Sequence, residues 1–135
     1  MKSDIDIKDD VLAVITGSEL EEAVTGIVTT TRRPADSTLE DITIAVTGNR
    51  NGEIQEAYVQ VNIHVRDIIR DDDGLYEEDQ DRLRELCQIA ADLLKVQRGD
   101  CFRMTLDSQT VEEEDGRKGH VICNTLLYRQ CNEGH

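Results

Sequence analysis

Near the C-terminus, two histidines and two cysteines have spacings that a zinc site can use. His120 lies three residues before Cys123, and Cys131 lies four residues before His135. Nitrogen and thiolate ligands of this kind bind zinc in tetrahedral sites. However, the stretch around His120 has the pattern of a strand, and residues three apart on a strand point to opposite faces. We therefore predict no metal site, and free, partly buried thiols at the four cysteines: Cys87, Cys101, Cys123 and Cys131.

A second run with metal-binding residue types is the acidic stretch from 71 to 81. Three aspartates at 71–73 precede Gly74, and further carboxylates follow at 77, 78, 79 and 81. An EF-hand calcium loop has glycine at position 6, an acidic or amide side chain at position 1 and glutamate at position 12. Aligning Gly74 with that glycine places Ile69 at position 1 and Gln80 at position 12, so the template fails. The carboxylates suit the N-terminus of a helix, where free backbone N–H groups favour negative charge.

His64 is the remaining candidate for acid–base chemistry. A general base must reach a substrate or a nucleophile, and the sequence around His64 offers neither. The chain contains no Gly-x-Ser-x-Gly elbow, no phosphate-binding glycine loop, no His-Glu-x-x-His helix and no dinucleotide-binding glycine pattern. We predict a protein that is not an enzyme, with no catalytic, cofactor-binding or metal residues, no cofactor, and His64 at the surface or at an interface.

The charge of the chain narrows the classes of partner. The 135 residues carry 15 lysines and arginines against 29 aspartates and glutamates, a net charge of −14. Because nucleic acids and anionic membranes are bound through lysine and arginine, we predict no direct nucleic-acid binding and no membrane association. The charge suits solubility or a basic partner. No apolar run approaches the ~20 residues of a membrane span and no signal peptide begins the chain, which favours the cytoplasm.

Residues 57–66 are the stretch around which the other elements are arranged. Apolar side chains at odd positions alternate with polar ones at even positions, which predicts a strand with one buried and one polar face. Residues 42–47 alternate in the same way, and Asn51-Gly52 between the two runs is a strong hairpin signal. A turn at Asn51-Gly52 brings the apolar sets together in these pairs: Val46 with Ala57, Ile44 with Val59 and Ile42 with Val61.

The remaining patterns complete an α+β fold. Helices are predicted at about 5–16 and 76–96, ended by Gly17 and Gly99, with a short helical turn at 18–24. Further strands are predicted at about 26–32, 102–107 and 120–130. The apolar stripe of the second long helix is expected to pack on the hairpin. We predict a single domain over 1–135: a mostly antiparallel sheet of about four to five strands, packed by two helices.

Several stretches resemble small proteins of phage-like elements in gut bacteria. They are Arg-Pro at 33–34 followed by Ser37, Glu-Asp-Ile-Thr-Ile at 40–44, Val-Gln-Val-Asn-Ile-His-Val at 59–65, and Arg-Leu-x-x-Leu at 82–86. The layout of elements along most of the chain is similar to that of tail-terminator, or tail-completion, proteins of long-tailed phages. The resemblance implies a structural protein of a phage or prophage tail, located in the bacterial cytoplasm or in the assembled virion.

That family implies a homo-oligomeric ring, commonly of six subunits, which caps the tail tube and contacts other tail or head-completion proteins. We expect the subunit interface on the polar face of the 57–66 strand, or on the 120–130 strand, whose two apolar faces are also typical of a central strand. An acidic decoy that mimics DNA and binds a basic partner is the alternative function. The expected interface residues are Tyr58, Gln60, Asn62 and His64.

Overall fold

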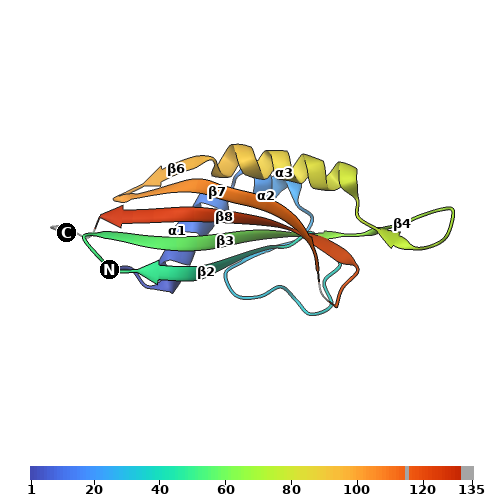
Figure 1. The fold of residues 1–135 in the computed structure, drawn as a ribbon, viewed down its shortest axis with the longest axis horizontal. Helices are drawn as coiled ribbons and strands as arrows, with labels where there is room; N and C mark the ends of the chain where they lie inside the picture. Colours follow the sequence, from blue (N-terminus) through green and yellow to red (C-terminus); the bar gives the residue numbers. More distant parts are fainter. Residues whose placement is uncertain (115, 132–135) are drawn as a thin grey trace.

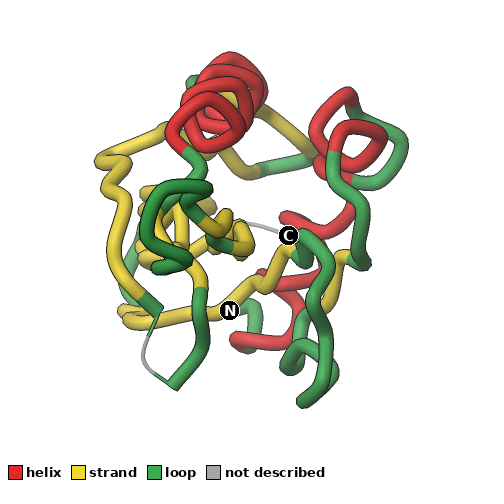
Figure 2. The backbone as a smooth tube through the Cα atoms, turned by 90° about the vertical axis from the view of Figure 1, so that its right-hand side faces the viewer, coloured by secondary structure: helices red, strands yellow, loops and turns green. Residues whose placement is uncertain are grey.

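A computed structural model describes residues 1–114 and 116–131. It shows an α+β fold in which one six-stranded sheet carries three helices on one of its faces (Figures 1 and 2). The strand order is β1-β2-β3-β8-β7-β6; β1 runs parallel to β2, and the other pairs are antiparallel.

The helices are α1 (Asp4–Ile15), α2 (Glu19–Ala23) and α3 (Gln80–Leu94). The strands of the sheet are β1 (Val28–Thr29), β2 (Ile42–Arg50), β3 (Ile54–Arg66), β6 (Val96–Gly99), β7 (Phe102–Glu113) and β8 (Gly119–Cys131).

The α+β class predicted from the sequence is confirmed, but the sheet is larger than predicted and partly parallel. Only two residues of the predicted 26–32 strand join the sheet, and they lie parallel to β2. Residues 96–99, predicted as the end of a helix, instead form β6, which pairs with β7 through a tight turn. Cys101 in that turn has a φ of +64°, a left-handed conformation that lets the chain reverse. Pairing with β7 thus overrides the local preference for helix.

The hairpin of β2 and β3 forms as predicted, but the predicted register is wrong by two residues. Ile44 pairs with Val61 rather than with Val59. The connection spans residues 51–53 rather than two residues, and a bulge interrupts the ladder between Val46 and Gly48. Because side chains alternate with a period of two, the two-residue shift keeps Ile42, Ile44 and Val46 on their predicted face, whereas the pairing beyond the bulge is offset by one further residue.

Helices and sheet share one hydrophobic core. Ser3 begins α1 with a capping box, in which its side chain and that of Asp6 bond each other's backbone N–H groups. The prediction that α3 packs on the hairpin is wrong: α1 lies against β2, whereas α3 lies against β6, β7 and β8. The odd-numbered apolar residues of β3 are buried beneath these helices: Ala57, Val59, Val61, Ile63 and Val65.

A two-stranded ribbon projects beyond the body of the molecule (Figure 1). It consists of β4 (Ile68–Ile69) paired with β5 (Tyr76–Glu77), and the predicted start of α3 at 76 is therefore wrong. α3 begins at Gln80 after Asp79, whose side chain accepts a hydrogen bond from the Arg82 N–H. Most carboxylates of the 71–81 run thus lie on this ribbon rather than at the helix N-terminus.

Candidate functional site

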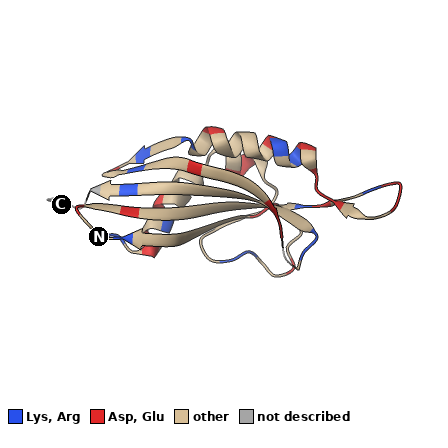
Figure 3. Ribbon diagram, in the orientation of Figure 1, with Lys and Arg blue, Asp and Glu red and all other residues tan. Residues whose placement is uncertain are grey.

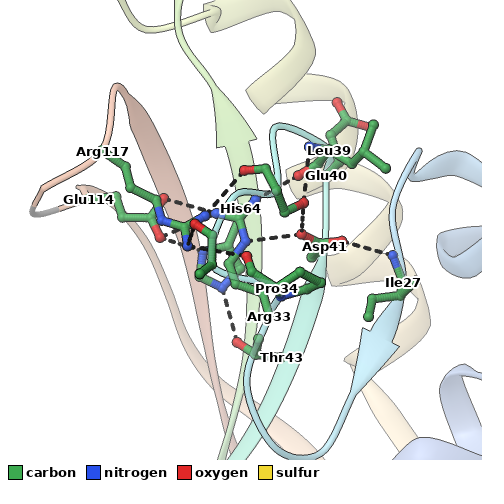
Figure 4. Close-up of polar contacts among 12 residues, drawn as sticks. Ile27, Arg33, Pro34, Leu39, Glu40, Asp41, Thr43, His64, Glu114 and Arg117 are labelled. Atoms are coloured by element: carbon green, nitrogen blue, oxygen red, sulfur yellow. Dashed lines mark hydrogen bonds and ion pairs between the residues drawn. The ribbon is translucent and has the colours of Figure 1, made fainter.

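His64 occupies the centre of a polar cluster where β2, β3 and the end of β7 meet (Figure 4). Its Nε2 lies 3.1 Å from Thr43 Oγ1, and its Nδ1 lies 2.9 Å from Glu114 Oε1. The imidazole is only 11% exposed and the Glu114 carboxylate 16%. His64 is therefore largely enclosed within the chain rather than exposed at its surface, and the alternative expectation, a position at an interface, stays a prediction.

The surroundings of His64 determine its protonation state. Burial lowers the pKa of His64 below its ordinary value, against the opposing effect of the Glu114 carboxylate, so the ring is neutral at pH 7. A carboxylate can only accept a hydrogen bond, which assigns the single proton to Nδ1, donated to Glu114. Nε2 then accepts the Thr43 hydroxyl proton. The contact between His64 and Glu114 is thus a hydrogen bond at neutral pH rather than an ion pair.

Arg33 joins this histidine to a buried aspartate. Arg33 Nε lies 3.0 Å from Asp41 Oδ2, Nη1 lies 3.3 Å from Glu114 Oε2, and Nη2 donates to the Leu39 carbonyl at 2.7 Å. The Arg33 side chain is 10% exposed and that of Asp41 2%. One guanidinium thus connects the 30–41 loop with the end of β7, which lies 81 residues away.

Asp41 is the most completely enclosed carboxylate of the cluster. Its Oδ1 accepts the Ile27 N–H at 2.9 Å, and its Oδ2 accepts the Ser37 hydroxyl at 2.5 Å. Burial raises the pKa of Asp41, but the hydrogen bonds from Ser37, Ile27 and Arg33 outweigh it and hold the pKa below its ordinary value. Asp41 is therefore ionised and satisfied. A Cβ at Gly26 would clash with this carboxylate, so the approach requires glycine.

Arg117 fastens the same loop from the β7–β8 turn. Its guanidinium donates to three backbone carbonyls, those of Pro34, Ala35 and Ser37, at 3.3, 2.8 and 3.2 Å. Together with the network of Arg33 it fixes a loop that has little regular structure of its own. We name this set the arginine clamp: Arg33, Asp41, His64, Glu114 and Arg117.

Thr43, His64 and Glu114 form a hydrogen-bonded series of a hydroxyl, a base and an acid that orients the base, which is the composition of a catalytic triad. Acyl transfer by such a set also needs donors directed at the oxygen of the reacting group. Within the clamp the guanidinium groups are directed at carboxylates and backbone carbonyls instead. We interpret the clamp as a device that holds the loop to the sheet.

The four predicted interface residues do not all lie on one open surface. Tyr58, Gln60 and Asn62 lie on the sheet face opposite the helices, where register pairs them with Leu127, Thr125 and Cys123 of β8. Tyr58 is 46% exposed. The His64 side chain, in contrast, is hydrogen-bonded to Glu114 in the clamp and is only 11% exposed. Nothing in the sequence distinguished Glu114 from the neighbouring carboxylates of 112–115, whereas Arg33, Ser37 and Asp41 lie in stretches that carry the family resemblance.

Of the four residues considered for a zinc site, the structure describes only the side chains of His120 and Cys123. His120 pairs with Val65 and Cys123 with Asn62, so the two side chains lie on opposite faces of β8, as predicted. His120 Nδ1 bonds Asp67 Oδ1 at 2.7 Å. His135 lies outside the described residues, and the described residues contain no group of three metal ligands.

The thiols whose side chains the structure describes are free, as predicted, and Cys87 and Cys123 are partly buried, whereas Cys101 is exposed. The side chain of Cys131 lies outside the described part of the chain. Burial, together with the nearby Glu112 carboxylate, raises the pKa of Cys123 to about 11. This thiol is protonated at neutral pH and therefore a poor nucleophile.

No protein-family model matches the sequence, and no curated protein matches it significantly. Among the described residues no helix is long and apolar enough to cross a membrane. The case for a function therefore depends on the chain's own surfaces.

Proposed function

We propose that the chain is a non-enzymatic structural subunit of a phage or prophage tail, of the tail-terminator type, which assembles into a closed ring. The observation that carries the proposal is the sheet face opposite the three helices, which no helix of the described residues covers (Figure 2). The two surfaces considered from the sequence, the polar face of β3 and the second face of β8, are neighbouring halves of this one surface.

The composition of this face suits contact between like-charged subunits. From Tyr58 to Asn62 on β3, and from Cys123 to Leu127 on β8, its side chains are uncharged. These residues are only partly buried within the chain. This face can therefore lie against a neighbouring subunit without bringing excess carboxylates of its own into the contact, which lowers the repulsion expected of chains that each carry −14.

A ring of such subunits accounts for the expected partners. Its remaining acidic surface would repel DNA passing through the tail rather than bind it. Other tail or head-completion proteins would meet the ring, in the bacterial cytoplasm during assembly and afterwards in the virion.

Bulky substitution on the uncovered face tests the proposal. Gln60→Trp places a large side chain at the centre of the face and is expected to reduce the mass measured by light scattering from that of a closed oligomer to that of one subunit. Gln88→Trp, on the exposed side of α3, is the matched control and is expected to leave the mass unchanged. An oligomer that survives Gln60→Trp, with circular dichroism confirming a folded chain, would contradict the proposal.

The acidic decoy is the second candidate function. The observation that favours it is the projecting ribbon, whose exposed carboxylates at 71–73 and 77 are presented away from the body. A decoy predicts a monomer at every concentration, and binding to a basic DNA-binding protein that weakens steeply with salt. A closed oligomer would argue against it.

A further inference from the structure

Four arginines line up across the sheet at the end opposite the projecting ribbon (Figure 3). Register pairs Arg98 with Arg103, Arg103 with Arg129, and Arg129 with Glu56. Glu56 in turn pairs with Arg50, so five strands contribute one residue each. Directly opposed residues share a face of the sheet. We name this set the arginine row: Arg50, Arg98, Arg103 and Arg129.

The arginine row has little counter-charge within the chain. Arg129 Nε lies 3.1 Å from Glu56 Oε2, and both side chains are largely solvated. Arg50, Arg98 and Arg103 are exposed, and in the described part of the chain no carboxylate lies within 4.0 Å of their guanidinium groups. Like charges opposed on neighbouring strands are unfavourable. Such a row in a chain with nearly twice as many acidic as basic residues indicates a counter-charge outside the fold.

A groove with an apolar floor lies beside the row. Its volume is about 420 Å³, and Arg98, Arg103 and Arg129 line it together with Ile54 and Phe102. The Ile54 side chain is 57% exposed. The groove therefore combines a cationic rim with apolar surface that is accessible to a partner.

The projecting ribbon has the complementary chemistry. We name residues 68–77 the acidic arm; it carries four carboxylates and one arginine, Arg70. Arg70 lies 2.8 Å from Asp72 and 3.8 Å from both Asp73 and Glu77, but one arginine offsets only one of the four carboxylates, so the arm keeps a negative charge. The arm also exposes four large apolar side chains: Ile68 at 44%, Ile69 at 55%, Leu75 at 62% and Tyr76 at 39%. Exposed apolar residues on a projecting element are typical of an interaction site.

We infer that the acidic arm of one copy docks in the groove of a second copy, with its carboxylates on the arginine row. Arginine binds carboxylates through two parallel hydrogen bonds, and burial of the apolar residues of the arm adds to the contact. The arm and the row lie at opposite ends of the molecule, so one chain cannot make this contact with itself (Figures 1 and 3).

Each copy offers one arm and one groove, and the contact is therefore head-to-tail. Head-to-tail contacts close into a ring when the rotation between subunits permits it. The inference rests on the proposed function, because it supplies the contact by which the ring would close. It also gives chains of net charge −14 an attractive contact of opposite charges.

Charge reversal with rescue tests the docking, with mass by light scattering as the readout. Arg98→Glu with Arg103→Glu reverses the row, and Asp71→Lys with Glu77→Lys reverses the arm. Each double variant alone is expected to weaken assembly about tenfold or more, since like charges then oppose each other. An equimolar mixture of the two is expected to assemble again, because every contact regains opposite charges. Arg84→Glu with Arg32→Glu, two exposed arginines outside the row, is the matched control and is expected to assemble normally.

The possible outcomes distinguish a failure of the docking contact from a failure of the ring proposal. If the oligomer persists in both reversed variants, the docking is overturned while the ring proposal stands. If the mixture fails to reassemble although each variant is folded, the groove does not bind the arm of a second copy, and the docking is overturned. If the unmodified chain stays monomeric but binds single-stranded DNA or an acidic protein through the row, both the ring and the second copy as occupant are overturned.

Discussion

The arginine clamp and the arginine row place the same residue type in opposite situations. In the clamp, Arg33 is 10% exposed and lies within hydrogen-bonding distance of two carboxylates and a carbonyl. In the row, Arg98 and Arg103 are exposed and oppose each other across two strands. The comparison shows two roles for arginine in this acidic chain. The buried, paired Arg33 ties a loop to the sheet, whereas Arg98 and Arg103 have no carboxylate within 4.0 Å among the described residues, and we propose that a second copy supplies one.

The largest effect on stability is expected from a substitution at Asp41 in the clamp. Asp41→Ala leaves Arg33 without its closest carboxylate and removes the acceptor of Ser37 and Ile27, so we expect a loss of about 3–5 kcal/mol in the free energy of unfolding. Urea denaturation at pH 7 measures it. Asp81→Ala, at a carboxylate that is 99% exposed, is the control and is expected to change stability by no more than ~0.5 kcal/mol. A loss below about 1 kcal/mol for Asp41→Ala would show that the clamp does not stabilise the fold.

A smaller effect is expected from titrating His64. Its pKa in the folded chain lies below the ordinary value of 6.5, so between the two values the unfolded chain binds more protons. Stability from the neutral ring is therefore fully present above about pH 6.5 and falls as the pH drops toward the folded pKa. Glu114, Arg33 and Asp41 face the ring and shape this response.

We expect His64→Gln to flatten the dependence of unfolding free energy on pH below about pH 6.5, the ordinary pKa of histidine, because the pKa of His64 in the folded chain is lowered. Denaturation in urea at several pH values measures the slope. A slope that is the same with and without His64 would contradict the assignment of a buried, neutral ring.

The smallest effect on stability is expected in the row. Arg103→Ala removes a charge that opposes Arg98 and Arg129, so the free energy of unfolding is expected to change by no more than ~0.5 kcal/mol and to rise rather than fall. Thermal denaturation at low ionic strength measures it. A loss of more than 1 kcal/mol would place Arg103 among the structural arginines and remove the contrast with the clamp.

Local patterns in the sequence predicted the individual elements well. The alternation in 57–66 predicted the strand β3 and its buried face, and the helix predicted at about 5–16 with Gly17 at its end matches α1 to within one residue. The register of the hairpin was wrong because a bulge and a three-residue connection leave no sign in the alternation. β6 was missed because pairing with β7, rather than the preference of residues 96–99, decides its conformation.

Neither arginine cluster could be predicted, for one physical reason. Arg33 and Glu114 meet across 81 residues, and the row depends on the register of five strands at once. Such groupings follow from topology, which the local spacing of residues does not specify. The uncovered sheet face, in contrast, was partly predicted, since alternation alone assigned Tyr58, Gln60 and Asn62 to it.

The most direct test of the account is the absolute mass of the unmodified chain in solution as salt is raised from about 0.01 M to 1 M. The Debye length falls from about 30 Å to about 3 Å over this range. Moderate salt therefore screens the long-range repulsion of the acidic chains, whereas high salt also weakens the contacts of the arm with the row. The account predicts a closed oligomer with its highest mass near physiological salt and smaller species at both extremes. A mass of one subunit throughout, or one that rises steadily to 1 M, would contradict it.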